Sequence, residues 1–240
     1  FHVGVHNLAP EGAAETRERM QRFTSAPEAG PRVLGGILRD LAAAPGALIV
    51  LNHPYWDQPW IGPARHEARL REFVAEFRHS IHALEINGLR SWQENRKVVR
   101  LAQQTGLPLI SGGDRHGREP NATLNLTNAA SFAEFAEEIR GGETSQVLVM
   151  PHFHDPLVAR IFQGLWDVMS EHAEHAEGRV HWSQRVFRRC DDDQVRSFDA
   201  YFPNGEPFLT KRLLQLARVA SSRKLRPAWK AMAFRSEMAL

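Results

Sequence analysis

A short apolar run that ends in two chemically active side chains constrains this chain more than any other stretch. The run from Leu107 to Gly117 reads L-P-L-I-S-G-G-D-R-H-G, so two glycines separate its apolar part from Asp114 and His116. This pattern predicts a buried strand that leads into a tight turn, and loops at strand carboxyl ends bring side chains together in α/β folds. Asp114 and His116 are therefore candidate metal ligands and catalytic residues. The alternative is a turn aspartate that caps the next segment beside an incidental histidine.

Two further strand-like segments carry histidines at or near their ends. The segment Ala47 to Pro54 reads A-L-I-V-L-N-H-P and delivers His53 after an apolar run. The first eight residues, F-H-V-G-V-H-N-L, alternate in the way that a half-buried strand does and carry His2 and His6. Because the same chemistry recurs on three predicted strands, the sequence favours one shared metal centre over three incidental turns.

Helical patterns lie between the predicted strands. Apolar residues recur at helical spacing over residues 31–44, 63–79 and 91–104, and another strand is predicted over 81–87. Alternation of strand and helix predicts parallel strands joined by right-handed crossovers. Within the last of these strands, Glu85 either steadies a metal ligand or contacts substrate, or it is an ordinary strand-end glutamate bonded to a neighbouring strand.

Composition and charge narrow the class of protein. The 240 residues carry 30 Lys and Arg against 28 Asp and Glu, a net charge of +2, so non-specific nucleic-acid binding is not indicated. No apolar run approaches the roughly 20 residues of a membrane span. The single cysteine, Cys190, excludes a disulfide within the chain and fits a cytoplasmic location. The chain begins without methionine inside a predicted strand, so we expect residues upstream of Phe1 to have been lost.

The order of these motifs resembles the later part of the polymerase and histidinol phosphatase (PHP) superfamily. The motifs are H-V-G at His2, N-H-P at His53, L-E-I-N at Glu85 and G-G-D-R-H-G over 112–117, with helices between them. The resemblance covers residues 1–150. It implies an incomplete, distorted seven-stranded β/α barrel of the TIM type, with two or three divalent metal ions at the strand carboxyl ends.

The resemblance also implies roles for particular residues. It makes His2, His53, Asp114 and His116 metal ligands and implies hydrolysis of a small phosphorylated substrate by metal-activated water. Imidazole and carboxylate ligands together suit Zn, Mn or Fe. The positions of Arg115, between two predicted ligands, and of Arg118 just after them also suit binding of the substrate phosphate through paired N–H groups. Alternatively, these arginines are solvated in the loop or form ion pairs with Glu119.

The family's opening H-x-H pair and bridging glutamate would lie before His2, where this chain has only Phe1. The sequence therefore leaves two classes of function open. One is a metal-dependent phosphoesterase, and the other is a truncated or degenerate PHP-like module that serves as a scaffold or binding domain. A hydrolase of amides or lactones would use similar ligands, and the oligomeric state is not predicted.

The remainder of the chain, residues 151–240, predicts a mainly helical extension. Apolar residues follow helical spacing over 155–177, 209–220 and 222–238. A second H-x-H pattern, at His152 and His154, follows a predicted strand and is closed by Pro156. We interpret these two histidines as packed at a domain junction in preference to a metal site.

Overall fold

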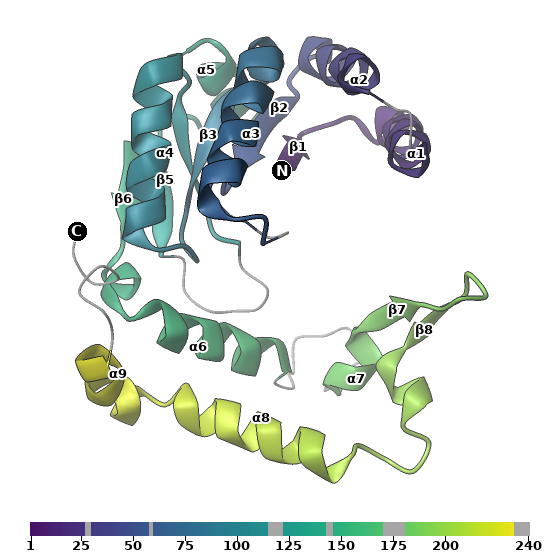
Figure 1. Cartoon of the computed structure of the whole chain (residues 1–240), viewed down its shortest axis with the longest axis vertical. Helices are drawn as coiled ribbons and strands as arrows, with labels where there is room; N and C mark the ends of the chain where they lie inside the picture. The colour runs from purple at the N-terminus through teal and green to yellow at the C-terminus, as the bar shows by residue number, and fades with distance from the viewer. Residues whose placement is uncertain (27–29, 58–59, 115–121, 143–145, 170–180, 233–240) are drawn as a thin grey trace. The chain divides into compact units, whose positions relative to one another are not determined.

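The structure is a computed structural model of the chain and describes residues 1–26, 30–57, 60–114, 122–142, 146–169 and 181–232 (Figure 1). These residues divide into two compact units. The first unit contains residues 1–113 and 122–150, and the second contains 114–121 and 151–240. Within the described ranges, no helix combines the length and the apolar character that a membrane span requires.

A four-stranded sheet forms the centre of the first unit. Its strands follow the order β1-β2-β3-β4, and their bounds are β1 His2–His6, β2 Leu48–Asn52, β3 Ala83–Asn87 and β4 Leu109–Gly112. The last three strands are parallel, whereas β1 runs antiparallel to β2. A separate antiparallel pair consists of β5 Thr123–Leu126 and β6 Gln146–Val149.

Helices cover the two faces of the sheet unequally. The helices of this unit are α1 Pro10–Ser25, α2 Pro31–Ala43, α3 Pro63–Phe77, α4 Trp92–Thr105 and α5 Phe132–Arg140, with the 3₁₀ turn η1 Arg78–Ser80. One face of the sheet packs on the apolar stripes of α2, α3 and α4, and Leu51 and Leu84 are fully buried there. The opposite face packs on α5 through Leu48, Val50 and Ile110. Burial of aliphatic side chains on both faces stabilises each strand by roughly 1.5–3 kcal/mol per fully buried side chain.

Local sequence signals set the ends of the two helices nearest β3 and β5. Ser91 accepts a hydrogen bond from the Glu94 backbone N–H at the start of α4, and Gly106 ends that helix in the left-handed region at φ +69°. Ser131 caps α5 in the same way by accepting from the Glu134 backbone N–H. Each cap depends only on residues that are neighbours along the chain.

The predicted seven-stranded barrel is wrong. Within the described residues, the sheet is open, with β1 and β4 as its two edges. The side chain of Asn125 takes the place of a further strand beside β4: Asn125 Oδ1 accepts from the Ser111 N–H at 2.7 Å, and its Nδ2 donates to the Ser111 carbonyl at 3.3 Å. These bonds occupy main-chain groups of β4 that a neighbouring strand would otherwise pair. The prediction that every strand is parallel is also wrong, because β1 pairs with β2 in the antiparallel direction.

The second unit contains short helices and one hairpin. Its elements are η2 Pro151–His154, α6 Leu157–Met169, α7 Trp182–Arg185, β7 Phe187–Arg189, β8 Val195–Ser197, η3 Phe198–Tyr201, α8 Phe208–Ala220, η4 Arg223–Leu225 and α9 Arg226–Met232. The helices α6 and α8 lie side by side, and Phe162 stacks on Trp229 with ring centroids 5.7 Å apart. The strands β7 and β8 form an antiparallel hairpin that the sequence did not predict.

Candidate functional site

Two of the predicted metal ligands, His2 and His53, meet at one end of the sheet. His2 begins β1 and is paired in register with Asn52, the last residue of β2, so the antiparallel pairing brings His2 next to His53. Nδ1 of His2 lies 3.1 Å from Nε2 of His53. The ring of Trp56 contacts both imidazoles edge-on, with centroids 5.7 Å from His2 and 4.9 Å from His53. The indole therefore restrains both rings.

Glu85 supports the turn that presents His53. His53 has a φ of +29°, outside the regions that non-glycine residues prefer. Its backbone N–H donates to Oε2 of the buried Glu85 at 2.7 Å, and the same oxygen accepts from Nδ2 of Asn87 at 3.0 Å. Glu85 thus bonds to the backbone at the end of the neighbouring strand β2, and its role in steadying a metal ligand stays a prediction.

Because Gly112 has no side chain, the carboxylate of Glu85 can occupy the space beside it. A Cβ built on Gly112 would lie 1.7 Å from Oε1 of Glu85, a distance at which two atoms overlap. The glycines after the apolar run were predicted to permit a tight turn. Gly112 instead serves a close approach between β4 and the carboxylate on β3.

The structure does not place the remaining predicted site residues beside His2 and His53. Asp114 has a left-handed φ of +46° and belongs to the second unit, so its role as a ligand beside the two histidines stays a prediction. Arg115, His116 and Arg118 lie outside the described residues. Within the residues that are described, no group of three or more His, Cys, Asp and Glu side chains could hold a metal ion.

The other histidines that the sequence singled out lie elsewhere. His6 lines a separate cavity of about 240 Å³ together with Asn52, Glu85 and the aromatic rings of α5, and burial lowers its pKa. His152 belongs to the second unit, where its Nδ1 lies 3.2 Å from Oδ2 of Asp155. Burial lowers the pKa of His152, and the neighbouring carboxylate opposes that shift.

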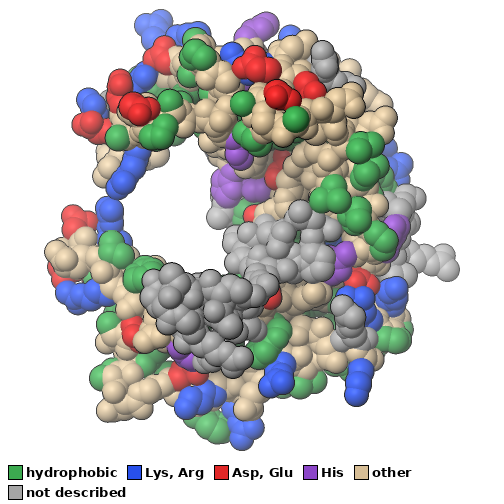
Figure 2. Space-filling model, turned by 180° about the vertical axis from the view of Figure 1, so that it is seen from behind, with side chains coloured by type: hydrophobic (Ala, Val, Ile, Leu, Met, Phe, Trp, Pro, Cys, Tyr) green, Lys and Arg blue, Asp and Glu red, His purple; other side chains and the backbone are tan. Residues whose placement is uncertain are grey.

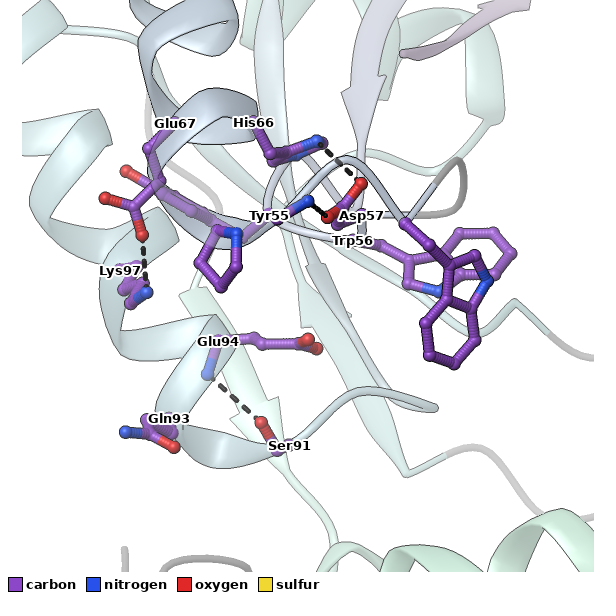
Figure 3. Close-up of a pocket in the computed structure, with 12 residues that line it drawn as sticks. Tyr55, Trp56, Asp57, His66, Glu67, Ser91, Gln93, Glu94 and Lys97 are labelled. Carbon is purple, nitrogen blue, oxygen red and sulfur yellow. Dashed lines mark hydrogen bonds and ion pairs between the residues drawn. The ribbon is translucent and has the colours of Figure 1, made fainter.

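Two cavities adjoin the histidine pair. The smaller, of about 120 Å³, is lined by both histidines together with Phe1, Trp56, Ile61, His66 and Arg69. The larger, of about 510 Å³, lies between the loop after β2, α3 and the start of α4 (Figure 3). Trp56 and His66 line both cavities, so the larger space borders the smaller one. Figure 2 also shows histidine side chains gathered on one face of the molecule with acidic side chains beside them.

His66 and Asp57 fix the loop between the two cavities. His66 is buried, and its Nε2 donates to the carbonyl of Pro54 at 2.8 Å, which leaves Nδ1 3.8 Å from Oδ1 of Asp57. Asp57 accepts from the backbone N–H groups of Ile61 at 3.0 Å and Gly62 at 2.7 Å. The sequence reasoning missed His66, whose one signal is a polar residue at a buried position of the helical pattern.

Comparison of the chain with models of protein families, with curated proteins and with solved structures finds no match among any of the three. The resemblance of the motifs to the PHP superfamily therefore stays a prediction.

Proposed function

We propose that the chain is a metal-dependent hydrolase, acting on phosphoesters, in which His2 and His53 are neighbouring ligands of one divalent ion. The observation that carries the proposal is the distance of 3.1 Å between Nδ1 of His2 and Nε2 of His53. Two nitrogens bound at about 2.0–2.1 Å to a tetrahedral ion lie about 3.3–3.4 Å apart. The two imidazole nitrogens lie about 0.2–0.3 Å closer than that spacing, so a small separation of the rings would admit an ion between two segments 51 residues apart in the chain.

The backbone conformations of two predicted ligands also support a metal site. His53 and Asp114 follow the parallel strands β2 and β4, and both have left-handed φ values, +29° and +46°. Such conformations cost about 1–3 kcal/mol each in a residue other than glycine, and they concentrate at functional sites. For His53 the buried carboxylate of Glu85 offsets that cost. Two of the ligands predicted from the sequence motifs are therefore held in strained turns.

A bound divalent ion would lower the pKa of a coordinated water and polarise the phosphoryl oxygen, which is the chemistry that phosphoester hydrolysis needs near neutral pH. The protein's own residues would orient the ligands and bind the substrate. Trp56 packs against both imidazoles and restricts their rotation. Arg69 lines the small cavity beside the pair, where its guanidinium can bind phosphate oxygens in the way proposed for Arg115 and Arg118. We keep the cytoplasm as the proposed compartment, since a single cysteine suits it.

The second candidate function is a non-catalytic binding module. It is favoured by the absence of a third ligand close to the histidine pair in the part of the chain that the structure describes. In that case the 3.1 Å contact is a hydrogen bond between two imidazoles, one of which donates and the other accepts.

Metal analysis of matched variants distinguishes the two functions. The hydrolase proposal predicts that His53→Ala and Asp114→Ala lose bound zinc or manganese and abolish hydrolysis of an aryl phosphate by the native protein. His152→Ala and His154→Ala should keep both properties, since they remove histidines from a different site. The proposal would be overturned if the His152 and His154 variants lose metal while the His53 and Asp114 variants keep it. It would also be overturned if the parent protein binds no metal.

A further inference from the structure

The larger cavity beside the histidine pair has an aromatic and acidic lining. Tyr55, Trp56 and Trp60 come from the loop after β2, and three carboxylates face them from that loop and from α3 and α4. Its volume of about 510 Å³ lies in the range of small-molecule sites. Trp60 is 92% exposed, which leaves its ring faces uncovered beside this space.

The three carboxylates that line the cavity differ in how they are paired. Asp57 is bonded to the N–H groups that open α3, and Glu67 is paired with the Lys97 ammonium at 2.6 Å. Glu94 has no comparable ion pair within the described residues, and its side chain extends into the cavity (Figure 3). Burial raises the pKa of its carboxyl, and the charges of Arg90, Lys97 and His66 with the Ser91 backbone N–H offset that rise only in part. The cavity therefore presents a half-buried carboxylate that forms no ion pair within the described residues.

The aromatic rings already attract cations from the chain itself. The guanidinium of Arg90 lies 3.9 Å from the ring centroid of Trp56, and the ammonium of Lys97 lies 5.5 Å from that of Tyr55. Electron-rich ring faces attract alkylammonium groups in the same way, most strongly where several rings and a carboxylate converge. The lining is thus electrostatically suited to a positive group.

We propose that this cavity binds an organic ammonium group, carried in the substrate on the leaving-group side of the phosphoester. The leaving-group part of the assignment rests on the proposed function, whereas the affinity for an ammonium group does not. Trp56 and His66 line both cavities, so a molecule whose ammonium lies against Glu94 and Trp60 extends toward the histidine pair. An anionic leaving group is disfavoured, because three carboxylates line the cavity and the one lysine in its lining, Lys97, is paired with Glu67.

Equilibrium binding of two molecules of the same shape tests the cation site without any catalysis. Choline and 3,3-dimethylbutanol differ in having nitrogen or carbon at the branch point, so only choline is charged. Calorimetric titration of the full chain should show choline binding at least about tenfold more tightly than the neutral alcohol. Equal binding of the two, or no binding of choline, overturns the proposal.

Single substitutions test whether choline binds in this cavity. Glu94→Gln keeps the shape of the side chain and should weaken choline binding about fivefold to tenfold, with no change for the neutral alcohol. Trp60→Ala should weaken choline binding as well. Glu76→Gln removes a carboxylate from an exposed position of α3 and should leave both affinities unchanged. Choline affinity that is insensitive to both Glu94→Gln and Trp60→Ala contradicts the assignment, provided that each variant shows the parent's thermal unfolding.

Hydrolysis measurements separate this inference from the proposed function. If the native protein hydrolyses phosphocholine and 3,3-dimethylbutyl phosphate with equal kcat/KM, the leaving-group assignment fails and the hydrolase proposal stands. If choline binds as predicted and neither ester is hydrolysed when zinc or manganese is supplied, the hydrolase proposal fails and the ammonium site stands. A higher kcat/KM for phosphocholine that Glu94→Gln removes supports both.

Discussion

The backbone N–H of His53 donates a hydrogen bond of 2.7 Å to Oε2 of Glu85, so a buried carboxylate on β3 holds the turn after β2. That turn carries the imidazole that lies 3.1 Å from His2. The candidate site therefore depends on a residue that does not itself face the small cavity beside the histidines. This relationship can be tested separately from catalysis.

Replacement of Glu85 by alanine should destabilise the chain and weaken metal binding. The variant leaves the His53 N–H and Asn87 Nδ2 without their shared acceptor, and an unsatisfied buried donor costs about 1–3 kcal/mol. Glu85→Gln should recover most of this loss, since a single carboxamide oxygen can accept both bonds. Urea unfolding of the three proteins measures the effect. Equal stability of Glu85→Ala and the parent would show that the turn does not depend on the carboxylate.

Alanine at Gly112 should be strongly destabilising, and alanine at Gly36 should not. A Cβ at Gly112 would lie 1.7 Å from Oε1 of Glu85, so either the carboxylate or the strand has to move, at a cost of about 1–3 kcal/mol or more. No atom lies within 4 Å of a Cβ at Gly36 in α2, where alanine should stabilise the helix by about 0.5–1 kcal/mol. Thermal unfolding of the two variants provides the comparison. A tolerated Gly112→Ala would mean that Glu85 is not confined by β4.

Stability should fall on acidification in a way that depends on His82. Nδ1 of His82 accepts the Ile49 backbone N–H at 2.9 Å, and burial lowers the pKa of His82, with the Arg140 charge acting in the same direction. Between the lowered folded pKa and the ordinary value of 6.5, the unfolded chain binds more protons than the folded chain. The contribution of His82 is therefore present above pH 6.5 and is lost as the pH falls through the folded pKa.

His82→Asn provides the matched measurement, because the asparagine oxygen can accept the same backbone bond and does not titrate. The free energy of unfolding should decrease less steeply from pH 8 to 5.5 in the variant than in the parent. His6 and His152 also have lowered pKa values, but they titrate in both proteins. Identical pH slopes would show that His82 is not a source of the acid sensitivity.

The local elements of the first unit and the parallel direction of β2, β3 and β4 were predictable from sequence, whereas the antiparallel β1 and the open sheet were not. The helical stripe predicted over 31–44 corresponds to α2 Pro31–Ala43, and the strand predicted over 81–87 contains β3 Ala83–Asn87. These elements depend on periodicity and caps a few residues apart. The direction of β1 depends on pairing between His2 and Asn52, which lie 50 residues apart. No local pattern specifies that pairing or the closure of a sheet.

Some residues of the candidate site were likewise predictable from sequence, and others were not. His2 and His53 were identified because strand-end histidines recur, and the structure brings them together. The cavity that contains Glu94 was missed, because its lining comes from a loop and two helices that meet only in the folded chain. Asn125 shows the same limit: it lies on β5, and its side chain bonds to Ser111 on β4, a contact that no local pattern indicates.

X-ray absorption at the zinc edge of the zinc-loaded chain tests the central claim most directly, since it reports the ligands of the ion without reference to substrate. The account predicts scattering from two imidazoles with zinc–nitrogen distances of about 2.0–2.1 Å, and the loss of one imidazole in His2→Ala and in His53→Ala. A spectrum without imidazole scattering, or one that neither substitution changes, would contradict the claim that these two histidines bind a metal ion.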